Sequence, residues 1–92
     1  MIDRIDEIVS LTTEISEHIY MRSQKNVSKL YIRLLDAFAV FLSEMEAMGY
    51  HVDLNEELFK LQRAYTKKDY IELSDLLLYE IKPEFEELRQ SF

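Results

Sequence analysis

Apolar residues recur at alternating steps of three and four along almost the whole chain, which is the spacing of amphipathic helices. Three breaks interrupt this pattern: a polar run at residues 24–26, a stretch that begins with glycine at 49–53, and a lysine-rich turn at 67–69. Breaks of this kind separate helices from one another. The pattern therefore predicts four helices, which cover residues 3–23, 27–48, 54–66 and 70 onward.

Several residues at these breaks have the side chains that begin or end helices. Asp3 and Asn26 are candidate N-caps of the first two helices. Gly49 is the only glycine in the chain and directly follows the second helix, so it is expected to end that helix in a left-handed conformation. Asp53 and Asp69 each precede a glutamate by three positions, which is the capping-box pattern at a helix start.

Pro83 lies inside the last predicted helix. Proline has no backbone N–H and its ring clashes with the carbonyl four residues earlier, here that of Tyr79, so a kink or break is expected near residues 81–82. The connections between helices are short, which favours antiparallel neighbours. We therefore predict one all-α domain over residues 1–92, an up-and-down bundle of four helices whose last helix is kinked or broken near Pro83.

Composition narrows the functional classes. Of the 92 residues 48% are hydrophobic, enough to form a core, and there is no cysteine to bind zinc, act as a nucleophile or form a disulfide. With 11 basic and 18 acidic residues the net charge is -7, which disfavours binding to nucleic acid or to an anionic membrane surface. No secretory signal and no membrane-spanning stretch are visible, so a cytoplasmic protein without a cofactor is expected.

Some apolar residues fall away from the core-facing stripes when helical positions are counted at about 100° per residue. A bundle of this size exposes single apolar side chains, but several on three helices indicate a surface for another protein. We therefore predict a non-enzymatic protein–protein interaction module that forms a homodimer and serves as a small adaptor, regulator or chaperone-like protein. The predicted partner-binding residues are Ile32, Val40, Phe59, Leu76 and Tyr79.

Two pairs of carboxylates support an alternative function. Glu14 and Glu17 form an E-x-x-E pattern, and Glu72 and Asp75 form an E-x-x-D pattern, so each pair lies on one side of its helix. This arrangement resembles the metal-binding pattern of the MazG-type all-α nucleotide pyrophosphohydrolases, and the resemblance implies magnesium-dependent hydrolysis of nucleotides. Hydrolysis of this kind requires the four carboxylates to lie close together in space. Both pairs lie on polar helix sides, where exposure to solvent explains them equally well.

Residues 64–83 carry a second resemblance. A helix end, an Asp69-Tyr70 start and the closing Pro83 resemble the turn region of a tetratricopeptide repeat, which implies a tight helical hairpin. Lys68 stands where that family has its turn glycine, and no second repeat follows, so a repeat solenoid is not expected. The same C-terminal half also resembles short, uncharacterised all-helical bacterial proteins, a likeness that implies no activity.

Two further features leave alternatives open. Methionines near residue 48 either pack in the core or line a groove for a peptide or small apolar ligand. A group of basic residues around the first turn either steers an acidic partner or is a solvated helix end. That group consists of Arg22, Lys25, Lys29 and Arg33.

Overall fold

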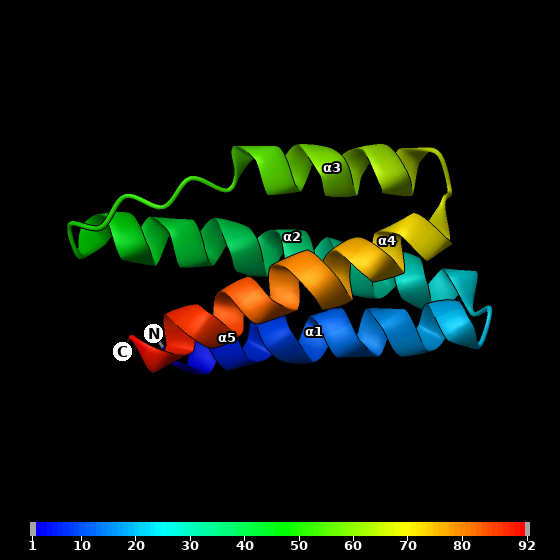
Figure 1. Ribbon diagram of the computed structural model, residues 1–92, viewed down its shortest axis with the longest axis horizontal. Helices are drawn as coiled ribbons and strands as arrows, with labels where there is room; N and C mark the ends of the chain where they lie inside the picture. The colour runs from blue at the N-terminus through cyan, green and yellow to red at the C-terminus, as the bar shows by residue number, and fades with distance from the viewer. Residues whose placement is uncertain (1, 92) are drawn as a thin grey trace.

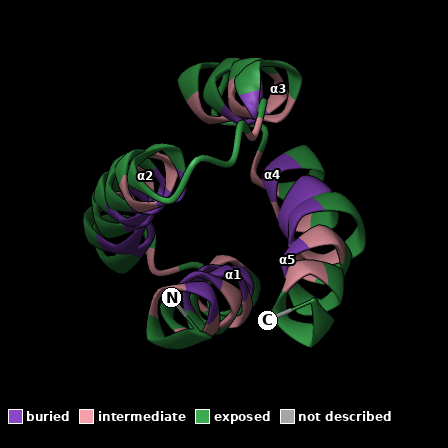
Figure 2. Ribbon diagram, turned by 90° about the vertical axis from the view of Figure 1, so that its left-hand side faces the viewer, coloured by how far each residue is buried: buried purple, intermediate pink, exposed green. Residues whose placement is uncertain are grey.

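The computed structural model describes residues 2–91, and it confirms both the all-α class and the four-helix bundle. The helices run side by side in alternating directions and occupy four corners in chain order, with their buried faces turned inward (Figures 1 and 2). The bundle measures 39 × 21 × 20 Å. Its elements are α1 (Ile2–Tyr20), α2 (Gln24–Ala47), α3 (Asn55–Thr66), and a last helix of three joined pieces, α4 (Tyr70–Leu76), the π-helical turn η1 (Leu77–Ile81) and α5 (Lys82–Gln90).

The interruption expected near Pro83 takes the form of the π turn η1. Here the N–H of Lys82 donates to the carbonyl of Leu77, five residues earlier instead of four. Pro83 then lies in the first turn of α5, where a backbone N–H has no essential partner. The extra residue in η1 thus lets the last helix pass the proline without ending.

The π turn also sets which side chains face the core. Leu73, Leu77, Ile81 and Phe85 are spaced by four, and in an uninterrupted α-helix each such step overshoots a full turn by about 40°. Over three steps this drift would carry Phe85 out of the core. The wider turn of η1 advances less per residue and reduces this drift, and all four side chains are fully buried.

Phe85 is the centre of the aromatic core. Its ring centroid lies 5.6 Å from that of Phe38 and 5.0 Å from that of Phe41, in tilted and edge-to-face arrangements that aromatic rings favour. Both partners belong to α2, diagonally across the bundle from α5 (Figure 2). Phe85 therefore joins the last helix to the second through the interior.

A second aromatic pair joins α2 to α3. The rings of Tyr31 and Tyr65 stack with their centroids 4.1 Å apart. The Tyr31 hydroxyl donates to Gln62 Oε1 at 2.9 Å, and the Tyr65 hydroxyl donates to Ser28 Oγ at 3.0 Å. Burial, together with the neighbouring Tyr65, raises the pKa of Tyr31 to about 12, so this hydroxyl keeps its proton and remains a donor.

The helix ends confirm some predictions and correct others. Gly49 has φ +86° and ends α2 as expected. Asp69 caps α4 by accepting from the Glu72 N–H at 3.1 Å, also as expected. Asp53 instead accepts from the N–H of Asn55, two residues later, because α3 starts one residue further along than the capping box required.

The N-caps predicted for the first two helices are wrong. Asp3 already lies inside the first turn of α1, which includes Ile2. Asn26 lies inside α2, which starts at Gln24, and its side-chain amide donates to Ser23 Oγ. Both helices thus begin earlier than the capping residues indicated, because packing of their apolar faces carries the helix past a locally favourable start.

Three helix ends share one motif, although two of them lack a glycine. At the end of α2, the N–H groups of Gly49 and of the next residue donate back to the carbonyls of Glu46 and Met45. The same pair of hydrogen bonds closes α1 and α3, where Arg22 and Lys68 take the glycine position with φ +60° and +58°. Lys68, the position that stands for the turn glycine in the tetratricopeptide resemblance, thus adopts the left-handed conformation that glycine favours.

Substitution of Lys68 by glycine should stabilise the fold. Glycine removes the clash that a Cβ atom makes in the left-handed conformation, and we expect the free energy of unfolding to rise by about 0.5–1 kcal/mol. Urea denaturation measures this change. Lys67→Gly is the matched control, because Lys67 has an ordinary helical φ of −78°, and it should lower stability. A loss of stability in Lys68→Gly would contradict the assignment of strain to residue 68.

Candidate functional site

The predicted partner-binding residues do not gather on one surface. Ile32 and Val40 on α2, Phe59 on α3 and Tyr79 in η1 are exposed. However, these helices occupy different corners of the bundle, and their outer faces point in different directions (Figure 2). Ile32 and Val40 share α2, but the residues on α2, α3 and η1 do not line one common surface (Figure 2).

The prediction that Leu76 lies off the core face is wrong. Leu76 is only 9% exposed and belongs to the hydrophobic core. It is the last residue of α4, which packs against both α1 and α3, so the buried arc of this helix is wide enough to include adjacent residues 76 and 77. A charge at Leu76 would destabilise the fold and so could not test association.

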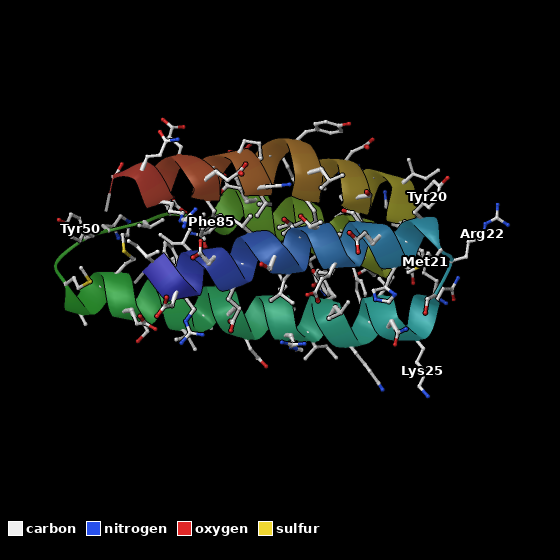
Figure 3. All side chains as sticks on the ribbon, turned by 90° about the horizontal axis from the view of Figure 1, so that it is seen from below. Tyr20, Met21, Arg22, Lys25, Tyr50 and Phe85 are labelled. Atoms are coloured by element: carbon white, nitrogen blue, oxygen red, sulfur yellow. The ribbon has the colours of Figure 1, made fainter. Side chains whose placement is uncertain are left out.

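The structure instead forms an apolar groove between the second half of α1 and the helix that runs from α4 into η1. The groove has a volume of about 620 Å³. Its middle is lined by small side chains, and Tyr20 and Met21 stand at one end, 90% and 61% exposed (Figure 3). We call this the α1–α4 groove, and its lining consists of Thr13, Ser16, Glu17, Tyr20, Met21, Ser74 and Leu78.

The lining includes a buried hydroxyl with no hydrogen bond. Ser16 is 9% exposed, and its Oγ has no partner among residues 2–91. Thr12, one turn earlier on α1, is also buried but donates to the carbonyl of Val9 at 2.6 Å. A buried hydroxyl without a partner costs stability, and because the Oγ atom is itself inaccessible, Ser16 gives the groove a small side chain and no hydrogen-bond donor.

Sequence reasoning missed this groove for a physical reason. Helical periodicity assigns residues to faces of one helix but does not say which two helices meet along their flanks. The first helix was expected to continue to residue 23, which would have placed Met21 within it. Because α1 ends at Tyr20 and turns at Arg22, Met21 lies in the turn beside the groove.

The carboxylates of the alternative hypothesis do not assemble into a metal site. Glu14, Glu17, Glu72 and Asp75 are all exposed, on α1 and α4. Across residues 2–91, no group of three or more His, Asp or Glu side chains is placed to hold a metal ion. The ligand set that magnesium-dependent hydrolysis requires is therefore not formed within the described part of one chain.

Comparison with known proteins gives one match. The model of a family described as "Domain of unknown function (DUF8042)" matches residues 1–91. Neither a curated protein nor a solved structure matches the chain. None of the helices in residues 2–91 is long and apolar enough to cross a membrane.

A cluster of carboxylates lies at the opposite end of the bundle from Tyr20, where α3 begins and α5 follows η1. Partial burial, then the negative charges of Glu57, Glu80 and Glu87, raise the pKa of Glu84 above its ordinary value of 4.5. Lys60 bridges Glu80 and Glu56 but does not neutralise the whole cluster. One oxygen of Glu57 is also buried without a hydrogen-bond partner among the described residues.

Glu84→Gln should therefore stabilise the protein at pH 7. A carboxyl with a raised pKa binds its proton more tightly in the native state than in the unfolded chain, so its contribution to stability falls as the pH rises. The gain from glutamine should shrink as the pH falls below 4.5, where the carboxyl is protonated in both states. Denaturant unfolding at pH 7 and at a pH below 4.5 measures the change in the free energy of unfolding. Glu86→Gln, on the outer face of α5, is the control. A gain that is equal at both pH values would contradict this assignment.

Proposed function

Because the chain belongs to the DUF8042 family, whose description names no activity, we propose a function from the structure of the chain alone. The protein is a non-enzymatic protein-binding module that associates with a second copy of itself through the α1–α4 groove. In this form it serves as a small adaptor, regulator or chaperone-like protein. The lack of cysteine is compatible with a reducing compartment such as the cytoplasm.

The exposure of Tyr20 carries this proposal. An aromatic ring that is 90% exposed gains from burial in a partner, and tyrosine is enriched at the centres of interfaces. Next to this ring, Met21 adds an adaptable apolar surface. The groove beside both residues has a floor of small side chains, among them Thr13 and Ser74, which leaves room for a ring from another chain.

A second copy fits this arrangement by symmetry. If the two α1 helices run antiparallel about a twofold axis between residues 16 and 17, Tyr20 of each copy lies opposite Thr13 of the other. The two residues are seven positions apart, a distance of about 10 Å along the helix, so each groove receives the other copy's ring. Such a contact is closed, because the same patch serves both subunits.

The charges along α1 limit how closely the two copies approach. Glu14 and Glu17 lie toward the middle of the helix and Arg22 beyond its end. In the antiparallel register facing positions sum to 33, so Arg22 of each copy faces position 11 of the other, about one helical turn from Glu14. The two Glu17 carboxylates lie next to the twofold axis in this register and repel each other, so they must turn outward to solvent.

Tyr20→Lys should prevent dimer formation and leave the fold intact. The side chain is almost fully exposed, so the substitution removes no core contact, whereas in the dimer it places a charge in an apolar groove. Sedimentation velocity over a concentration series measures the association, and circular dichroism checks the fold. The unmodified chain should form a dimer with a dissociation constant well below about 1 mM.

Tyr79→Lys is the matched control, since it makes the same change at another exposed tyrosine outside the groove. This variant should remain dimeric. The proposal fails if the unmodified chain is a monomer at about 1 mM, a binding free energy weaker than about 4 kcal/mol. It also fails if Tyr79→Lys disrupts the dimer and Tyr20→Lys does not, because the contact would then involve the separate exposed residues predicted from the sequence.

A further inference from the structure

The basic residues of this acidic protein are concentrated at one end. Residues 18–35 contain no acidic residue, and residues 63–68 are likewise free of acids. The turns between α1 and α2 and between α3 and α4 bring these two segments to the same end of the bundle (Figure 1). Seven of the eleven basic residues belong to this group, which we call the basic end: Arg22, Lys25, Lys29, Arg33, Arg63, Lys67 and Lys68.

None of these seven residues forms an ion pair with another side chain among residues 2–91. By contrast, three of the four basic residues that lie elsewhere, Arg4, Lys60 and Arg89, are each paired with a carboxylate, and among residues 2–91 Lys82 is not. The chain has 18 acidic residues, so the unpaired state of the basic end does not come from a shortage of carboxylates. Like charges held together repel one another, and an anionic ligand would offset this cost.

A polar groove opens within the basic end. It lies between the start of α2 and the turn from α3 into α4, and its volume is about 530 Å³, within the range of small-molecule sites. Lys25 and Lys68 contribute charge from its two sides, and hydroxyl and amide groups lie between them. Its lining consists of Gln24, Lys25, Ser28, Tyr65, Thr66, Lys68 and Tyr70.

The hydroxyl groups of this groove are available as donors. Ser28 Oγ accepts a hydrogen bond from the Tyr65 hydroxyl, so the proton of Ser28 is free to be donated to a ligand. The hydroxyl of Thr66 also lines the groove. Two ammonium groups and two hydroxyl donors around one cavity match an anion that carries several oxygens and about two negative charges.

The backbone at Lys68 supplies a separate observation. This residue adopts φ +58°, which a glycine would adopt at less cost, yet the chain has a lysine there. Strained backbone that carries a charged side chain into a cavity is typical of binding sites, where some stability is given up for function. The strain therefore coincides with one of the two cationic groups of the groove.

We infer that this groove binds a phosphate group between Lys25 and Lys68, with Ser28 and Thr66 as hydroxyl donors. The tyrosine rings of Tyr65 and Tyr70 line the rest of the cavity and favour a ligand with a flat or apolar portion next to its phosphate. A long polyanion is disfavoured, because beyond the basic end it would meet the acidic remainder of the molecule. The ligand class is thus a small phosphate ester or a phosphorylated side chain.

Titration with inorganic pyrophosphate, followed by two-dimensional NMR of the ¹⁵N-labelled chain, tests this inference. Saturable shifts should centre on the amides of residues 25, 28, 66 and 68. Lys25→Gln and Lys68→Gln should each weaken binding about fivefold to tenfold, because each removes one charge–charge contact. Lys67→Gln is the matched control: it removes the same charge from the neighbouring residue, which does not line the groove, and should change affinity less than twofold.

Other probes identify the source of the phosphate, and some of their outcomes would overturn the inference. A phosphoserine peptide and a nucleoside monophosphate are titrated in parallel, and tighter binding of either one than of pyrophosphate supports the site and shows which source it takes. Shifts that never saturate, or an equal loss of affinity in Lys67→Gln, would reduce the groove to a diffuse basic surface. Tighter binding of polyglutamate than of every phosphate probe would identify an acidic polypeptide instead.

Tyr20→Lys should retain phosphate binding, so failure of the proposed dimer is distinguishable from failure of this site.

Discussion

The π turn before Pro83 is the constraint on which the rest of the structure depends. It keeps Phe85 between Phe38 and Phe41 despite a spacing of four that would otherwise carry the ring out of the core. Because the helix continues through the proline, its pieces α4, η1 and α5 all pack against α1. The α1–α4 groove is a result of this alignment, since its two walls, with Ser74 and Leu78 on one side, stay parallel only while the last helix remains unbroken.

The parts of the fold that could be predicted from the sequence are those with local causes. Helical periodicity, the left-handed Gly49 and the Asp69 cap depend on neighbours within a few residues, and the structure confirms them. The burial of Leu76 and the π turn depend on contacts between distant segments, which periodicity does not encode. For the same reason the groove beside Tyr20 was missed, whereas individual exposed residues such as Phe59 were identified correctly as exposed.

The two ends of the bundle differ in charge and in the cost of their turns. At the basic end, Arg22 and Lys68 end their helices in a conformation that suits glycine. At the opposite end, Gly49 ends α2 without this strain, and carboxylates crowd around Glu84. The unpaired basic groups, the strained turns and the exposed Tyr20 thus occur together at one end, and both proposed binding sites use residues from that end.

We propose that two copies meet through the α1–α4 grooves with their α1 helices antiparallel. The most direct test is an isotope-filtered nuclear Overhauser experiment on a mixture of ¹³C-labelled and unlabelled chains, which detects only contacts between copies. We expect contacts from the Tyr20 ring of one copy to the methyl group of Thr13 in the other. Contacts that instead involve Ile32, Val40 or Phe59, with none from Tyr20, would contradict it.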